Sequence, residues 1–437
     1  MSGGRTASGA LIAVVTAVLT VVLLLGVTAA APIRTSGRLG DGVAIAGVAL
    51  TPPMGWNTWN SYGCDISARV VQQAADALVS SGMRDAGYRY VIVDDCWFEP
   101  ARGPGGVLRA DPARFPQGMR AVADYVHARG LKFGIYESPN DRTCAQLGGA
   151  YPGRTGSAGH EALDARTFAD WGVDYLKYDW CAPESDLDRQ LSAFTRMRDA
   201  LRDTGRPIVY SINANSDVLA VPPGAIYDWS GIATMWRTTN DVTPAWAIGL
   251  GVATSQGIRE ILDTTAPLTD RAGPGHWPDP DMLEVGVAGV PGTLTPGLTA
   301  AEQRTQFGMW ALLAAPLIAG NALPYLDSAT RALLTNPEVI AVDQDSLAAP
   351  ATAVPDTGGK VLRRTMSDGS AVVALTNRDR AATRIDTSAA AAGLPAAPRY
   401  EVRDLWTGAA SVTDGPLGAT VAAHDTVLLR IRPDTSA

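Results

Sequence analysis

Acidic, basic and aromatic residues gather at five places in the chain, and each group lies at the end of a short apolar run. The groups are Trp56 with Trp59, Asp94-Asp95, Lys177-Tyr178-Asp179, Arg237 with Asp241, and Asp279-Pro280-Asp281. A single Asp pair of this kind is more often a turn or a helix N-cap than a site. Five such groups in corresponding places are much harder to explain as turns, and we interpret them as parts of one site.

Glycoside hydrolysis is the chemistry that this combination favours. The reaction needs one carboxylic acid to protonate the leaving oxygen and a second carboxylate on the other side of the anomeric carbon. Further carboxylates suit sugar hydroxyls, which donate well to ionised acceptors. A neighbouring Lys or Arg would keep a nucleophilic Asp ionised. The chain has only four His and no CxxC or HxxxH spacing, so we predict no metal site and no cofactor.

The apolar runs that lead into these groups have the pattern of buried β-strands. The strand-like segments are 50–56, 88–95, 131–138, 173–179, 207–213, 234–241, 276–282 and 316–321. Helical patterns lie between them, such as 67–82, where Ser67 can act as the N-cap and Gly82 as the stop. This alternation predicts an α/β fold, a (β/α)₈ TIM barrel over 48–347 with its active site at the C-terminal strand ends. An open doubly wound sheet is disfavoured because no GxGxxG follows the first strand.

The helical pattern stops after residue 347. From 359 to 434 the chain has short alternating runs separated by Gly, Asp and Asn. This pattern predicts a C-terminal antiparallel β domain, which we place at 350–435.

The N-terminal segment has the composition of an export signal. Residues 10–27 are an unbroken run of apolar or small residues, preceded by Arg5 and followed by the small residues of 28–31. We predict a signal peptide over 1–31, a linker over 32–47, and a secreted, extracellular protein. The run is also long enough to cross a bilayer, so an uncleaved anchor formed by residues 10–27 is the alternative.

Export makes the cysteine count informative. Cys64, Cys96, Cys144 and Cys181 form an even set, which in an oxidising compartment predicts two disulfides with three pairings open. The formal net charge of −8 argues against nucleic acid as a partner, because such binding rests on basic surface.

Eight motifs in the predicted barrel resemble the glycoside hydrolase family 27 α-galactosidases. They are GWNTWNSYGC (55–64), VDDCW (93–97), ADPARFPQGM (110–119), GIYES (134–138), KYDWC (177–181), WRTTND (236–241), DPDML (279–283) and AAPLIAGN (314–321). They follow the family order over residues 48–347, and the β domain after them also fits the family.

The resemblance implies a retaining exo-glycosidase that hydrolyses terminal α-D-galactosyl residues of an oligosaccharide or glycan by double displacement. Asp179 corresponds to the family's nucleophile and Asp241 to its acid/base. The implied substrate-binding residues are Trp59, Asp94, Asp95, Tyr136, Lys177, Arg237 and Asp281, with Asp94 and Asp95 holding the 4- and 6-hydroxyls. The family pairing joins Cys64 to Cys96 and Cys144 to Cys181. A retaining mechanism further predicts that the carboxyls of Asp179 and Asp241 lie about 5–5.5 Å apart.

The sequence departs from the family pattern after the fifth strand, where it has Ser-Ile-Asn-Ala-Asn-Ser over 211–216. Many members have a Glu where Asn213 stands and a bulky residue where Ser216 stands, and both crowd the sugar's 2-substituent. A smaller, neutral lining leaves α-N-acetylgalactosaminidase as an alternative, and β-L-arabinopyranosidase is a further family activity. A non-catalytic galactose-binding protein is the alternative from another class. The sequence leaves the oligomeric state open.

Overall fold

The computed structural model describes residues 37–182, 186–215, 223–249, 255–289 and 293–434. The predicted signal segment, with its apolar run at 10–27, lies outside these residues, as does Ser216. No helix within the described ranges is long and apolar enough to cross a membrane.

Eight short parallel strands form one sheet in the order β10-β1-β2-β3-β4-β5-β6-β9. The strands are β1 (Met54–Asn57), β2 (Tyr90–Val93), β3 (Lys132–Glu137), β4 (Tyr175–Asp179), β5 (Val209–Asn213), β6 (Met235–Arg237), β9 (Trp277–Asp279) and β10 (Leu317–Ala319). Just past β9, Leu283 forms a parallel bridge with Ala319 and so brings the two edges of the sheet together. All eight predicted strands are present, and the barrel prediction is confirmed.

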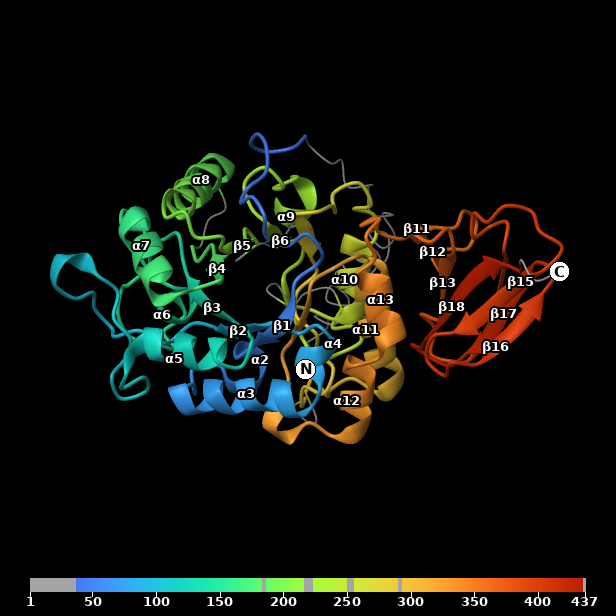
Figure 1. Ribbon diagram of the computed structural model, residues 1–437, viewed down its shortest axis with the longest axis horizontal. Coiled ribbons are helices and arrows are strands. Elements are labelled where there is room, and N and C mark those ends of the chain that lie inside the picture. The colour runs from blue at the N-terminus through green and yellow to red at the C-terminus, as the bar shows by residue number, and fades with distance from the viewer. Residues whose placement is uncertain (1–36, 183–185, 216–222, 250–254, 290–292, 435–437) are drawn as a thin grey trace, which may run out of the picture. The chain divides into compact units, whose positions relative to one another are not determined.

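Helices follow the strands and cover the outside of the sheet, as α3, α5, α7 and α8 show (Figure 1). The α-helices of the barrel are α2 (Trp59–Tyr62), α3 (Ala68–Ser80), α4 (Met83–Ala86), α5 (Gly118–His127), α6 (Cys144–Leu147), α7 (Glu161–Trp171), α8 (Leu187–Asp203), α9 (Pro223–Ile226), α10 (Ile258–Thr265), α11 (Ala300–Leu312), α12 (Ser328–Leu334) and α13 (Pro337–Asp343). Two short 3₁₀ helices are η1 (Pro104–Gly106) and η2 (Leu323–Tyr325). The predicted N-cap is correct, because the Ser67 side chain accepts a hydrogen bond from the Val70 amide at the start of α3.

The C-terminal β domain consists of antiparallel strands with a core of their own, built from residues such as Val373, Tyr400 and Ile431. Its strands are β11 (Thr352–Ala353), β12 (Val361–Thr365), β13 (Ala371–Thr376), β14 (Thr383–Ser388), β15 (Tyr400–Asp404), β16 (Ala410–Thr413), β17 (Pro416–Val421) and β18 (Thr426–Pro433). One sheet has the order β11-β12-β13-β18-β15-β16, and β14 pairs with β17 in a second. Helix α11 of the barrel contacts β13 and β18.

The described part of the predicted linker lies against the barrel. Within the predicted 32–47 linker, the described part from residue 37 onward contacts the barrel: Ala44 and Ile45 are buried, and Arg202 donates to the Ala44 carbonyl.

The four cysteines form the disulfides Cys64–Cys96 and Cys144–Cys181, as the resemblance implied.

Candidate active site

A cavity of about 610 Å³ opens at the C-terminal ends of the barrel strands. Ten residues predicted from the sequence line it together: Trp59, Asp94, Asp95, Tyr136, Lys177, Asp179, Asn213, Arg237, Asp241 and Asp281. Trp56 does not reach the cavity wall. It is fully buried in the core, and its indole N–H donates to the Asn321 carbonyl at 2.7 Å.

Lys177 lies between two carboxylates on the floor of the cavity. Its Nζ is 2.8 Å from Oδ2 of Asp94 and 3.7 Å from Oδ2 of Asp179. Asp94 also accepts a hydrogen bond from Nδ2 of Asn57 at 2.7 Å. The other oxygen of Asp179, Oδ1, is buried and has no hydrogen-bond partner among the described residues. Of the two Asp179 oxygens, Oδ2 is therefore the one nearer to Lys177.

Burial controls the ionisation of Asp179. It raises the pKa of Asp179 to about 7, while Lys177 and Arg237 act in the opposite direction and Asp94 and Asp241 add to the rise. Burial also opposes the charge of Lys177, yet the carboxylates of Asp179 and Asp94 hold its pKa above the ordinary value. The two cations thus favour the ionised nucleophile as predicted, but desolvation outweighs them.

Asp95 connects the cavity to the segment that carries α6. Its Oδ2 accepts a hydrogen bond from the Ala145 amide at 2.8 Å, and its Oδ1 accepts one from the Cys96 amide at 2.7 Å. Burial raises the pKa of Asp95 to about 6 against these hydrogen bonds. Cys144 and Cys181 also line the cavity, so their disulfide forms part of its wall.

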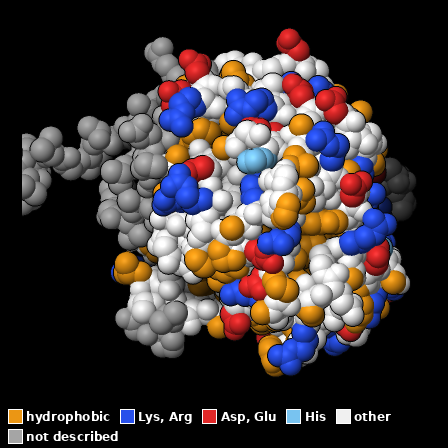
Figure 2. Space-filling view, turned by 90° about the vertical axis from the view of Figure 1, so that its left-hand side faces the viewer, with side chains coloured by type: hydrophobic (Ala, Val, Ile, Leu, Met, Phe, Trp, Pro, Cys, Tyr) orange, Lys and Arg blue, Asp and Glu red, His pale blue; other side chains and the backbone are white. Residues whose placement is uncertain are grey.

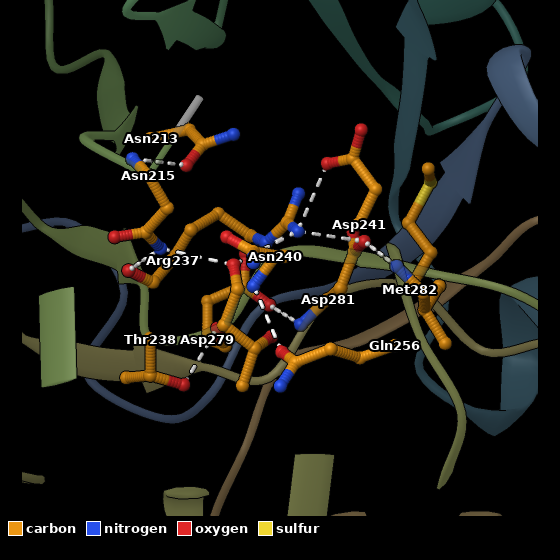
Figure 3. A network of polar contacts seen from close by, with 12 residues as sticks. Asn213, Asn215, Arg237, Thr238, Asn240, Asp241, Gln256, Asp279, Asp281 and Met282 are labelled. Carbon is orange, nitrogen blue, oxygen red and sulfur yellow. Dashed lines mark hydrogen bonds and ion pairs between the residues drawn. The ribbon is translucent and has the colours of Figure 1, made fainter. Parts of the chain in front are cut away.

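Arg237 organises the opposite side of the cavity (Figure 3). Nη2 of Arg237 lies 2.9 Å from Oδ2 of Asp281 and 3.1 Å from Oδ1 of Asp241. Asp281 also accepts a hydrogen bond from the Val242 amide at 2.8 Å. The side chains of Arg237 and Asp281 are only 5% and 6% exposed, whereas that of Asp241 is 64% exposed. Asp241 therefore lies at the rim, held by a buried ion pair beneath it.

Backbone strain accompanies this arrangement. Asp281 has a φ of +79° and Cys96, next to Asp95, has a φ of +74°. Non-glycine residues adopt such angles rarely, and only where the surrounding structure enforces them. Cys96 directly follows the cavity residue Asp95, and Asp281 is itself a cavity carboxylate, so both strained turns help to direct a carboxylate into the cavity.

Asn215 was missed by the sequence analysis, although it also lines the cavity. Its Nδ2 donates to the carbonyls of Arg237 and Thr239 at 2.7 and 2.9 Å, and its Oδ1 accepts from the Gly224 amide. The Asn215 amide in turn donates to Oδ1 of Asn213, whose nitrogen points away from Asn215 (Figure 3). The available signal was a polar residue two positions after β5, but the groups that Asn215 contacts lie in other segments of the chain.

Further lining residues that were not predicted are Asn60, Leu147, Gly148, Ala182, Val242, Ser255 and Met282. No group of three or more His, Cys, Asp or Glu side chains in the described part of the chain has an arrangement that could hold a metal ion.

Comparisons with known proteins identify the family. Residues 51–345 match the family model described as alpha galactosidase A, and residues 356–431 match that of the alpha galactosidase C-terminal beta sandwich domain. This chain belongs to the alpha-galactosidase A family. The resemblance to glycoside hydrolase family 27 is thereby confirmed, and the chain is a glycoside hydrolase.

Relatives cover nearly the whole chain. Alpha-galactosidase A of Cellvibrio japonicus is 40% identical over 88% of this chain and 93% of its own length. Among solved structures, alpha-galactosidase I from Mortierella vinacea has a TM-score of 0.78 at 33% identity and covers 90% of this chain and 99% of its own. The alpha-galactosidase from Saccharomyces cerevisiae with raffinose has a TM-score of 0.78 at 30% identity, covering 90% and 100%.

The raised pKa of Asp179 predicts a pH-dependent effect of Asp179→Asn on stability. The folded-state pKa of about 7 exceeds the ordinary Asp value of 3.8, so ionisation destabilises the wild-type fold as the pH rises between these values. The Asn variant cannot ionise and should be the more stable protein above pH 7, by about 4 kcal/mol at most. We expect its melting temperature to exceed the wild-type value at pH 7.5 and to approach it at pH 4.

Asp356→Asn is the matched control, because water surrounds the exposed Asp356 side chain in both the folded and the unfolded chain. This control should show no such pH-dependent difference. An Asp179→Asn protein that melts below the wild type at pH 7.5 would contradict the account of the buried carboxylate.

Proposed function

We propose that this glycoside hydrolase removes terminal α-D-galactosyl residues from galactoside oligosaccharides or glycans by double displacement, with Asp179 as nucleophile and Asp241 as acid/base. The observation that carries the proposal is that both domains match alpha-galactosidase models while all ten predicted residues line one cavity. The relatives named above are alpha-galactosidases, and a structural neighbour contains raffinose, a galactoside.

In the first step, an oxygen of Asp179 attacks the anomeric carbon and forms a glycosyl–enzyme ester as the bond to the leaving oxygen breaks. The Asp179 side chain lines the cavity, so its carboxylate can reach a bound sugar. Lys177 stabilises the negative charge of the free carboxylate from 3.7 Å. The same lysine also holds Asp94, so the position of the nucleophile and that of a sugar-binding carboxylate are coupled.

Asp241 supplies the proton that the leaving oxygen needs, and later takes a proton from the water that attacks the ester. Its exposure at the rim gives it access to an aglycone and to solvent. Arg237 holds the carboxylate from below, and the buried Asp281 balances the charge of that arginine. The two carboxyls therefore have different surroundings, which is the arrangement that acid/base and nucleophilic roles require.

Recognition of the sugar falls to the remaining lining residues. The Asp94 and Asp95 carboxylates accept from the 4- and 6-hydroxyls, and the rings of Trp59 and Tyr136 offer apolar surfaces. Asn213 uses its Oδ1 for the Asn215 amide, so its nitrogen can donate to the oxygen on C2 of the sugar. The complete Asp94-Asp95 pair favours galactose over arabinose, which has no 6-hydroxyl.

We also propose that the chain is exported and works outside the cell. The N-terminal composition and the two disulfides support this, since disulfides persist in oxidising compartments. Nucleic acid is not proposed as a partner: Figure 2 shows acidic and basic side chains interspersed on the face in view, and the formal net charge is −8. Sequencing the N-terminus of the secreted protein tests for cleavage near residue 31.

Replacing each catalytic aspartate should produce a different kinetic defect. Asp179→Asn should abolish turnover of every galactoside while leaving the protein folded, because the nucleophile is lost and the shape is kept. Asp241→Asn should retain most of its kcat/KM with a nitrophenyl leaving group, which needs little protonation, and lose on the order of 10²-fold or more with phenyl α-galactoside. Azide should partly restore kcat of Asp241→Asn. Equal losses for both leaving groups would overturn the assignment of Asp241.

The ionisation of Asp179 should appear in the pH profile. The free enzyme needs an ionised nucleophile, so kcat/KM should fall as the pH drops through about 7. Lys177→Met removes a charge that lowers the pKa of Asp179 and should move this acidic limb upward, on the order of one pH unit. Lys132→Met, at the other end of the barrel, should leave the limb in place. A limb that stays unchanged in Lys177→Met would contradict the electrostatic role of Lys177.

A panel of nitrophenyl glycosides tests the sugar specificity. The α-galactoside should be a better substrate than the α-N-acetylgalactosaminide or the β-L-arabinopyranoside. Asn213→Ala should lower kcat/KM for the α-galactoside by about tenfold, the value of one lost hydrogen bond, and affect the other two sugars differently. A tenfold preference for the N-acetylgalactosaminide would establish the alternative activity, and no turnover of any glycoside would favour a sugar-binding protein.

A further inference from the structure

The C-terminal β domain reaches the segment that follows the acid/base. His424, in the turn between β17 and β18, stacks on the ring of Trp246 with 4.5 Å between ring centroids and 11° between the planes. Trp246 lies five residues after Asp241 in the barrel. The stacked pair is therefore a direct contact between the second domain and the chain segment that carries a catalytic group.

Arg237 is a side-chain contact of the mostly exposed Asp241, so the position of its carboxylate also depends on the backbone that carries it. Asp241 and Val242 form the short strand β7, which pairs with β8 (Ser255–Gln256). The segment after β7 is then fixed to the start of α10, since the Ala245 and Trp246 carbonyls accept hydrogen bonds from the amides of Ile258 and Arg259 at 3.0 and 2.8 Å. Movement of Trp246 would thus be transmitted along a short, hydrogen-bonded segment to Asp241.

His424 itself is held firmly by helix α11. Its Nδ1 is 2.7 Å from Oε1 of Glu302, and its carbonyl accepts a hydrogen bond from Oγ1 of Thr305 at 2.7 Å. The next residue, Asp425, forms an ion pair with Arg304 of the same helix. His424 also has a φ of +57°, which a non-glycine residue adopts only when its surroundings enforce it.

We infer that His424 and Trp246 are positioning residues for Asp241, so that the C-terminal β domain contributes to proton transfer in the barrel. A fixed imidazole plane stacked on the indole restricts the movement of the 243–249 segment. Displacing a catalytic group by about 1 Å can cost on the order of 10²-fold in rate. This inference rests on the proposed acid/base role of Asp241.

The test compares substrates with two leaving groups. The ratio of their kcat/KM values depends on the acid and not on a general loss of structure. In His424→Asn and Trp246→Leu, kcat/KM for phenyl α-galactoside should fall by about tenfold or more, with a change of less than about threefold for the nitrophenyl substrate. Asn tolerates the positive φ at position 424. His424→Phe keeps a ring for stacking and should recover part of the lost activity. Trp246→Leu tests the same stack from the barrel side if His424→Asn does not fold.

Arg304→Gln is the matched control, because it removes a contact between the same helix and the same turn without touching Trp246. It should lower the melting temperature without changing the ratio of the two kcat/KM values. The inference is wrong if His424→Asn and Trp246→Leu reduce both substrates equally or leave both unchanged, or if Arg304→Gln changes the ratio as they do. If Asp241→Asn itself shows no leaving-group dependence, the proposed function has failed rather than this inference.

Discussion

The burial of several carboxylates around two cations at the barrel mouth is the constraint on which the rest of the structure depends. Lys177 lies between Asp94 and Asp179, and Arg237 lies between Asp241 and Asp281. Removing these charges from water is costly, and each cation offsets only part of that cost. The result is a nucleophile with a pKa of about 7 and a site that opposes folding at the pH where it is ionised.

The scaffold must compensate for this local cost. The ends of β4, β5 and β6 are fixed in register, with Asp179 beside Asn213 on neighbouring strands, and the Cys144–Cys181 disulfide closes the wall next to the nucleophile. Cys96, next to Asp95, and the cavity carboxylate Asp281 keep left-handed backbone angles. The rigid barrel and the second domain thus hold charged side chains in positions that these side chains would not keep on their own.

Much of the fold could be predicted because its signals are local. Strand patterns ending in polar residues gave eight correct strands, and Ser67 marked a helix start. Motif order gave the cavity residues and both disulfides. The features that were missed depend on neighbours in three dimensions. The raised pKa of Asp179 results from burial, and the role of Asn215 depends on carbonyls at and after the end of β6. The Trp246–His424 stack joins residues that are far apart in the chain.

In the proposed mechanism, buried Asp179, held by Lys177, forms a covalent bond to the sugar. The most direct test is to treat the enzyme with a fluorinated galactosyl fluoride that forms the glycosyl–enzyme faster than water hydrolyses it, and to map the labelled peptide by mass spectrometry. The account predicts one galactosyl adduct per chain, on Asp179. An adduct on another carboxylate, such as Asp94 or Asp281, or turnover of the reagent without any covalent adduct, would contradict it.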